Sequence, residues 1–202
     1  MSQLPDIPRL YTALAEWLAC MVYVMALRRR VEGWRLALEA GALLVVLSVF
    51  LVATGSLPVV FWLPCMAGAV GIMYGLIVLC GDVGPMDGLY YCVQAFVLAE
   101  FAASLVWQLH CFFLLDGPRF WGDWLLLLLV VYSGVFFAIR FSIQRVTTNN
   151  TPLSITWPEL SSAIIIGAAV FGASNLSFLS VNTPFSGRYS GEIFNIRTIM
   201  DL

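Results

Sequence analysis

Two carboxylates lie inside long apolar stretches of the chain, and these are the residues best placed to do chemistry. Glu100 lies near the middle of residues 90–115, which carry no other formal charge apart from His110. Glu16 lies near the middle of residues 10–27. A carboxylate at the centre of a bilayer costs roughly 2.5–3.5 kcal/mol, so it normally faces protein, water or a partner rather than lipid. Both residues therefore indicate helices that surround something polar.

Three polar side chains share the helical face of Glu100. At about 100° per residue, Ser104 falls about 40° from Glu100, Gln108 about 80° and Gln94 about 120°. A single polar face favours a lined cavity or a network between helices over scattered packing contacts. We therefore take Gln94, Glu100, Ser104 and Gln108, together with Glu16, as candidates for a ligand-sensing site or polar network.

The role of the two carboxylates stays open at this level. Both could be ionised beside arginine partners, or one could be protonated. Arg9 and Arg197 are the arginines expected near the same depth, and Asn182 lies in the same outer segment as Arg197. Packing between helices, recognition of a ligand, and conduction of ions or protons are all compatible with such residues.

Composition excludes a soluble domain. The 202 residues are 61% hydrophobic and 11% charged, with a mean hydropathy of +0.91, whereas soluble domains carry about 25% charged residues. The net charge is −2 and the basic tract is limited to residues 28–30, so we expect no nucleic-acid partner. The five cysteines lie in or beside apolar runs without a CxxC pair, which is typical of packing residues.

Catalytic signatures are missing from the sequence. It has no Gly-x-Ser-x-Gly motif, no Gly-rich phosphate loop and a single histidine, His110, which is too few for the histidine sets of metalloproteases. The glycines Gly68, Gly71 and Gly75 have the spacing of small residues at helix contacts. We expect this chain to carry no catalytic residues, no cofactor and no metal.

Charges and turn residues divide the chain into spans. Residues 40–81 contain no charge, and as one helix they would reach about 63 Å, twice the ~30 Å hydrocarbon layer, so the turn residues at 54–58 must break them into two spans. The sequence predicts an all-α, polytopic transmembrane helical bundle that forms one domain over residues 1–202. The expected spans are 10–27, 36–53, 59–79, 89–115, 124–139 and 160–178, with 196–202 as the start of a seventh.

Arginine placement predicts the orientation. Arg28, Arg29, Arg30 and Arg35 form the densest basic cluster and lie between the first two spans. By the positive-inside tendency this link is cytoplasmic, which places the N-terminus outside. The polar link over 140–158 is then inside. Because the apolar start at 196–202 has no continuation, we expect the chain to be a fragment of a longer protein.

Three stretches resemble the membrane-embedded sensor region of GHKL-type sensor histidine kinases from Firmicutes bacteria. They are RLYTALAEWLAC at residues 9–20, AFVLAEFAASLVWQL at 95–109, and residues 175–202 with NLSFL, NTPFS and IFNIRTIMD. They run from one end of the chain to the other and include both Glu16 and Glu100. Nothing in the chain matches the phosphoacceptor histidine or the ATP-binding motifs of such kinases.

The resemblance implies a signal-input domain in the bacterial plasma membrane. It would sense an extracellular or membrane-borne ligand, such as a peptide or an amphiphile, and relay the change to a C-terminal kinase that forms a homodimer. Six helices in about 200 residues also describe the small-solute-binding membrane subunit of a transporter. A purely structural membrane partner is the third alternative.

Overall fold

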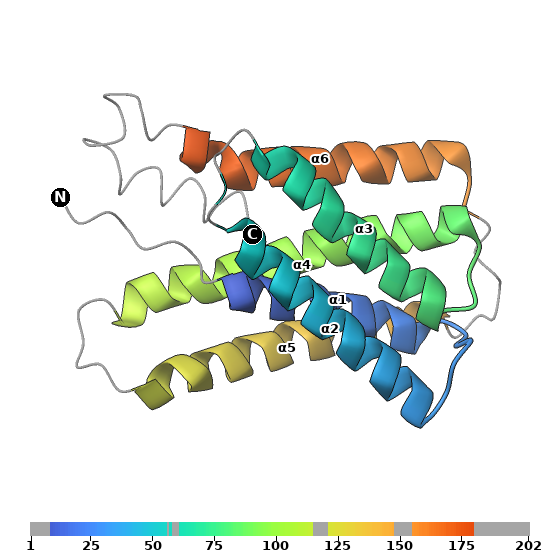
Figure 1. The fold of residues 1–202 in the computed structure, drawn as a ribbon, viewed down its shortest axis with the longest axis horizontal. Coiled ribbons are helices and arrows are strands. Elements are labelled where there is room, and N and C mark those ends of the chain that lie inside the picture. The colour runs from blue at the N-terminus through green and yellow to red at the C-terminus, as the bar shows by residue number, and fades with distance from the viewer. Residues whose placement is uncertain (1–8, 56, 58–60, 115–120, 148–154, 180–202) are drawn as a thin grey trace.

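Six α-helices make up the computed structural model, which describes residues 9–55, 57, 61–114, 121–147 and 155–179. These described parts contain no strand, and a single isolated bridge pairs Arg29 with Gly81. The helices are α1 (Arg9–Ala26), α2 (Trp34–Thr54), α3 (Trp62–Cys80), α4 (Pro85–Leu114), α5 (Trp121–Thr147) and α6 (Trp157–Leu179). They lie side by side along one long axis, with α2 and α3 crossing the others obliquely (Figure 1).

Consecutive helices run in opposite directions. The ends of α1, α3 and α5 and the starts of α2, α4 and α6 all lie at the right-hand end of the bundle in Figure 1. This alternation is the arrangement expected when each helix crosses the same slab and short links join neighbours. The seventh span predicted at 196–202 lies outside the described residues.

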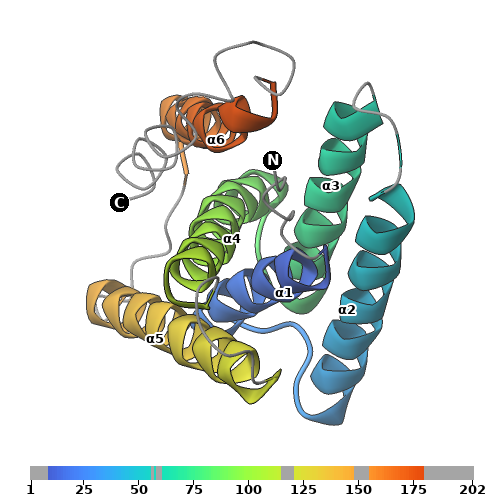
Figure 2. The same cartoon turned by 90° about the vertical axis from the view of Figure 1, so that its left-hand side faces the viewer.

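Helix α1 is the centre of the bundle. It packs against α2, α3, α4 and α5, whereas α6 packs only on α4 within the described structure. In Figure 2 α1 is surrounded by these four neighbours, and α6 stands apart at the edge. A helix enclosed by protein does not need an apolar surface for lipid, so α1 can carry Arg9 and Glu16.

Small residues allow α1 and α4 to approach closely. Ala15 and Ala19 on α1 are fully buried, as are Ala95, Ala99 and Ala102 on α4 to within 1% exposure. In a membrane, packing contacts between small residues replace the hydrophobic driving force that water supplies elsewhere. This alanine-lined contact joins the two helices that carry Glu16 and Glu100.

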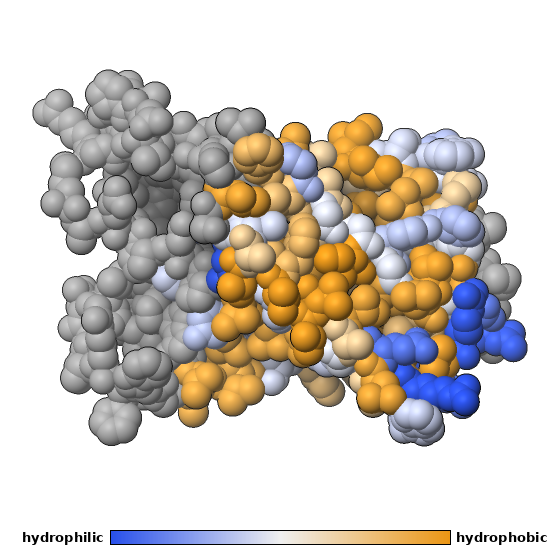
Figure 3. Space-filling view, in the orientation of Figure 1, coloured by the Kyte–Doolittle hydropathy of each residue, from blue (hydrophilic) through white to orange (hydrophobic). Residues whose placement is uncertain are grey.

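The outer surface is apolar and polar residues gather at one end. Large exposed hydrophobic side chains lie on α2, α5 and α6, including Val45, Val49, Leu126, Phe137 and Ile165. Figure 3 shows an apolar band across the bundle, with hydrophilic residues at its right-hand end. Such a surface is compatible with contact with a lipid bilayer.

Four helices are long and apolar enough to cross a membrane: Trp34–Thr54, Leu63–Cys80, Pro85–Leu109 and Leu125–Arg145. In addition, α6 contains a shorter apolar segment, Trp157–Gly172. The structure is therefore compatible with a multi-pass membrane protein. The six spans predicted from the sequence are matched by six helices, of which these four have the length and composition of a span.

Helix α5 extends well beyond the span predicted at 124–139. It continues to Thr147, so Arg140 and Arg145 lie on the helix rather than in a polar link. The Arg145 guanidinium lies 4.2 Å from the ring centroid of Phe141, and a cation in the last turn interacts favourably with the helix dipole. Charges mark where a helix leaves the apolar layer, but they do not end its hydrogen bonding.

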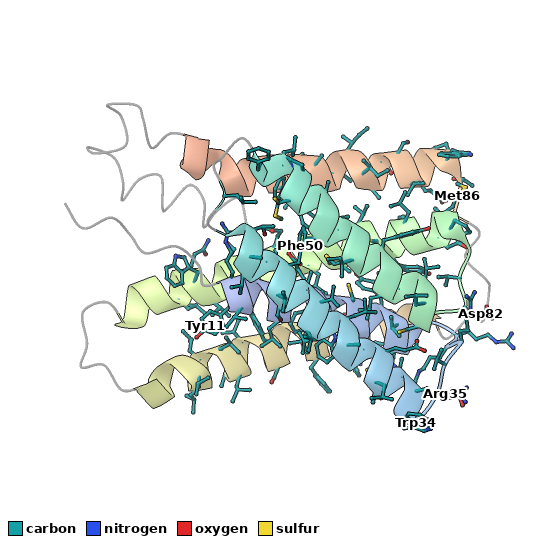
Figure 4. The ribbon with its side chains drawn as sticks, viewed as in Figure 1. Tyr11, Trp34, Arg35, Phe50, Asp82 and Met86 are labelled. Carbon is teal, nitrogen blue, oxygen red and sulfur yellow. The ribbon has the colours of Figure 1, made fainter. Side chains whose placement is uncertain are left out.

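The polar end is held together by bonds between links. The Arg30 N–H donates to the Cys80 carbonyl (3.0 Å), and the Asp82 N–H donates to the Arg28 carbonyl (2.8 Å). The Asp82 carboxylate also lies 3.9 Å from both the Arg28 and the Arg30 guanidinium groups. Figure 4 shows Asp82 and Arg35 at this end. The link that follows α1 is therefore bonded to the link that follows α3, and these bonds fix the positions of the two helices along the bundle axis.

Candidate functional site

Glu16 is the most deeply buried charged residue of the described structure. Its exposure is 1%, and neither carboxyl oxygen has a hydrogen-bond partner within the described part of the chain. The cause is the central position of α1, since a side chain near its middle is enclosed by neighbouring helices. A buried polar group without a partner is costly and rare, and therefore calls for a functional or chemical explanation.

The second carboxyl group near Glu16 is that of Glu100 on α4. The two carboxyl groups are close enough to interact electrostatically, and Arg9 also contributes a field at Glu16. Arg9 precedes Glu16 by seven residues, about 10.5 Å along the helix axis. Its Cγ lies 3.3 Å from where a Cβ on Gly55 would be, so the stem of Arg9 leans toward the end of α2. The structure thus brings the two predicted carboxylates together.

Ser104 and Gln108 form the second part of the site. They are 2% and 7% exposed, and the Gln108 amide donates to the Ser104 hydroxyl at 3.4 Å. Glu100 is half-buried one turn before Ser104. This spacing of four residues places the three side chains along one side of α4, in the half of the helix away from the polar end.

The other predicted site residues are less closely tied to this group. Gln94 is half-buried nearly two turns before Glu100, toward the polar end. Asn182 and Arg197 lie outside the described residues. The candidate site that the structure describes therefore consists of Glu16, Glu100, Ser104 and Gln108.

Two buried thiols beside Glu16 were not among the predicted site residues. Cys20 and Cys92 both interact electrostatically with Glu16. The Cys20 Sγ approaches the Met73 carbonyl at 4.0 Å, and the Cys92 Sγ approaches the Val70 carbonyl at 3.5 Å. Cys20 follows Glu16 by one helical turn, and this spacing could have identified it from the sequence. Cys92, which lies on α4, could be identified only from the packing of α1 against α4.

Polar side chains also fasten α1 to the helices around it. The Tyr132 hydroxyl on α5 donates to the Tyr11 carbonyl (2.9 Å), and the Trp17 indole donates to the Ala40 carbonyl on α2 (2.8 Å). Tyr11 lies in the half of the bundle away from Asp82 (Figure 4). Both bonds reach backbone carbonyls from large, mostly apolar side chains, so they position α1 without adding charge near Glu16.

The site has the chemistry of a receptor for positive charge or for hydrogen-bond donors. Two carboxyl groups and the side-chain oxygens of Ser104 and Gln108 are acceptors. Within the described parts of the chain, no three His, Cys, Asp or Glu residues group closely enough to hold a metal ion. The side chain of His110 is not among those described, although the residue itself lies on α4.

Comparison with known proteins identifies no relative of this chain. No protein-family model, no curated protein and no solved structure matches the chain.

Proposed function

We propose that the chain is the signal-input domain of a two-component sensor histidine kinase. It would cross the bacterial plasma membrane six times, with its N-terminus outside, and enter a seventh span at 196–202 that leads to a cytoplasmic kinase. The chain itself would carry no catalytic step. The observation that carries the proposal is Glu16, which is enclosed at the centre of the bundle against a second carboxyl group at Glu100.

The geometry supports sensing because it links one polar site to several helices. Glu16 lies on α1, which packs against four neighbours, and Glu100 lies on α4, which reaches α6 as well. A group that binds near these carboxylates changes the electrostatic energy of the α1–α4 contact. A ligand shifts an equilibrium between two arrangements only by its differential affinity for them, and a shared carboxylate pair offers such a difference.

The acceptor-rich site favours a cationic ligand, such as a positively charged amphiphilic peptide. The proposed test places the full-length protein in lipid vesicles and measures autophosphorylation from ATP. The probe is a cationic amphiphilic peptide, and its control is the same peptide with glutamine in place of every lysine. We expect the cationic form alone to change the phosphorylation level, because only it can be attracted by the Glu100 carboxylate.

The test requires matched variants of the protein. Glu100→Gln removes a carboxylate from the site, whereas Glu159→Gln makes the same change at an exposed position in the first turn of α6. We expect the dose response to weaken in the first variant and to persist in the second. Equal responses in the wild type and in Glu100→Gln would remove Glu100 from the mechanism.

A direct check on the kinase connection is the coding sequence that follows residue 202. An ATP-binding domain encoded there would support the proposal. A stop codon directly after residue 202 would overturn it, because no kinase could then receive the signal within one chain.

The compact six-helix bundle also supports a second candidate, a small-solute-binding membrane subunit of a transporter. Its acceptor groups lie on the two most enclosed helices, which suits stoichiometric binding of a small cationic solute. This function predicts that the purified 202-residue chain retains one small molecule through purification, which mass spectrometry would detect. A chain that carries no such molecule, and that binds none from a panel of small amines, would contradict it.

A further inference from the structure

The surroundings of Glu16 determine its protonation state. Both carboxyl oxygens are shielded from solvent, and within the described structure no donor reaches them. An ionised carboxylate in an apolar interior loses its hydration, and unless a partner compensates for that loss the group takes up a proton instead. Glu16 can therefore stay ionised only if a neighbouring group compensates for the lost hydration.

Among the described residues, the ionisable groups whose fields act on Glu16 lie on α1 and α4. On α1 they are Arg9, two turns away, and Cys20, one turn away. On α4 they are Glu100 and Cys92. Only Arg9 is a cation, and it forms no ion pair with Glu16 in the described structure.

Within the described part of the chain, the remaining neighbours offer no donor to Glu16. The two thiols point to carbonyl groups of α3, at Met73 and Val70. On α5, the Tyr132 hydroxyl is committed to the Tyr11 carbonyl. From α2 and α3, the buried side chains against α1 are apolar ones, among them Leu51, Ala69 and Met73.

The packing around Glu16 limits the size of any cation that could neutralise its carboxylate. The alanine-lined contact between α1 and α4 is buried on both sides of this residue, with Ala15 and Ala19 at 0% exposure. The described residues near it also provide no metal-binding group. A proton is the one cation that neutralises a carboxylate without requiring additional volume or ligands.

We infer that Glu16 is a proton-binding site, which holds its proton at neutral pH while α1 and α4 are packed together. Its proton can pass to water only when the two helices separate enough to admit water or another base. Ionisation of Glu16 is then coupled to the α1–α4 contact, and a charged Glu100 opposes it further. This inference goes beyond the proposed function, since it holds for a sensor, a transporter subunit or a structural protein alike.

Infrared spectroscopy of the 202-residue chain in lipid vesicles tests the inference directly. At pH 7 exposed carboxyl groups are ionised, because their ordinary pKa values lie near 4. The C=O stretch of an un-ionised carboxyl group must then come from a buried residue. We expect this band in the wild type, in Glu100→Gln and in Glu159→Gln, and its loss in Glu16→Gln.

Three outcomes would overturn the inference. They are a wild-type spectrum at pH 7 without the band, a band that survives in Glu16→Gln, and a band that disappears in Glu100→Gln instead. If Glu16→Gln does not fold, Glu16→Asp in protein labelled with carboxyl-¹³C glutamate replaces it. The labelled band must then be absent while the unlabelled aspartic acid band appears, and persistence of the labelled band refutes the assignment.

Failure here is distinguishable from failure of the signalling proposal. The infrared band reports where a proton resides, whereas autophosphorylation reports whether a kinase responds to the peptide. A protein that lacks the band but responds to the cationic peptide through Glu100 would keep the proposed function and lose the proton site.

Discussion

Replacing Ala99 by leucine tests whether the close contact between α1 and α4 holds the bundle together. Ala99 is 1% exposed and lies on the face of α4 that is buried with Ala95 and Ala102. On α1, the small residues Ala15 and Ala19 are fully buried. A leucine adds three carbon atoms at this buried position, so the helices must separate or the side chain must leave its preferred rotamer.

The expected cost follows from measured overpacking in protein cores. Insertion of extra methylene groups into a well-packed core destabilises by about 1–3 kcal/mol, and the added apolar area gives no compensation in lipid, where tails are as apolar as leucine. We expect Ala99→Leu to lower the free energy of unfolding by an amount in this range. The assay is equilibrium unfolding of the 202-residue chain in mixed micelles, titrated with a denaturing detergent.

Ala169→Leu provides the matched control. Ala169 is exposed on α6, the peripheral helix, so the same three carbon atoms meet lipid or detergent there. We expect its unfolding curve to overlay that of the wild type. If both variants unfold like the wild type, or if Ala99→Leu is the more stable, the α1–α4 contact is not the closely packed centre described above.

Two further predictions concern single polar contacts. Tyr132→Phe removes the donor to the Tyr11 carbonyl and should lower the free energy of unfolding by about 0.6 kcal/mol, the mean for interhelical hydrogen bonds in a membrane protein. The Tyr74 hydroxyl makes a longer, exposed bond to the Pro85 carbonyl (3.4 Å), so Tyr74→Phe should lower it by less in the same unfolding assay. The reverse order of the two variants would contradict this ranking. At the start of α6, the Glu159 carboxylate accepts from the Thr156 N–H (2.7 Å) and the Thr156 hydroxyl (2.8 Å), and these bonds lower the pKa of Glu159, the backbone bond first. Because the folded pKa is lowered, the stabilisation is complete above the unfolded pKa of about 4.3 and is lost as the pH falls through the folded value. Amide hydrogen exchange in the first turn of α6 should therefore accelerate in that range relative to Glu159→Gln. A constant ratio of exchange rates between the two proteins would show that the bonds between Glu159 and Thr156 do not stabilise this turn.

The class of the protein was available from local composition. A low fraction of charged residues and long apolar runs predict helices for a membrane because every backbone group in lipid must find its partner within the chain. The break near residues 54–58 and the links at 28–35 and 81–88 follow from turn residues and charges, and the structure places helix ends there. The extension of α5 to Thr147 could not be predicted from the sequence. Charged residues indicate where a helix meets water, but not where its backbone hydrogen bonds stop.

The centre of the bundle was decided by tertiary structure. Helical phase placed Ser104 and Gln108 on the side of Glu100, but it could not say which neighbour that side faces. Glu100 is the more prominent of the two carboxylates in the sequence, because the apolar run around it is longer. In the structure Glu16 is the more buried of the two.

The physical reason is that hydropathy measures what a helix would expose to lipid, whereas burial depends on what the other helices expose to it. Helix α1 carries two charged residues and falls outside the four helices with the composition of a span, yet it is the helix that the others enclose. The sequence alone determined that two carboxylates must be shielded from lipid. Only the packing of α1 against four neighbours decided that Glu16 would be the one that is buried and has no donor within the described structure.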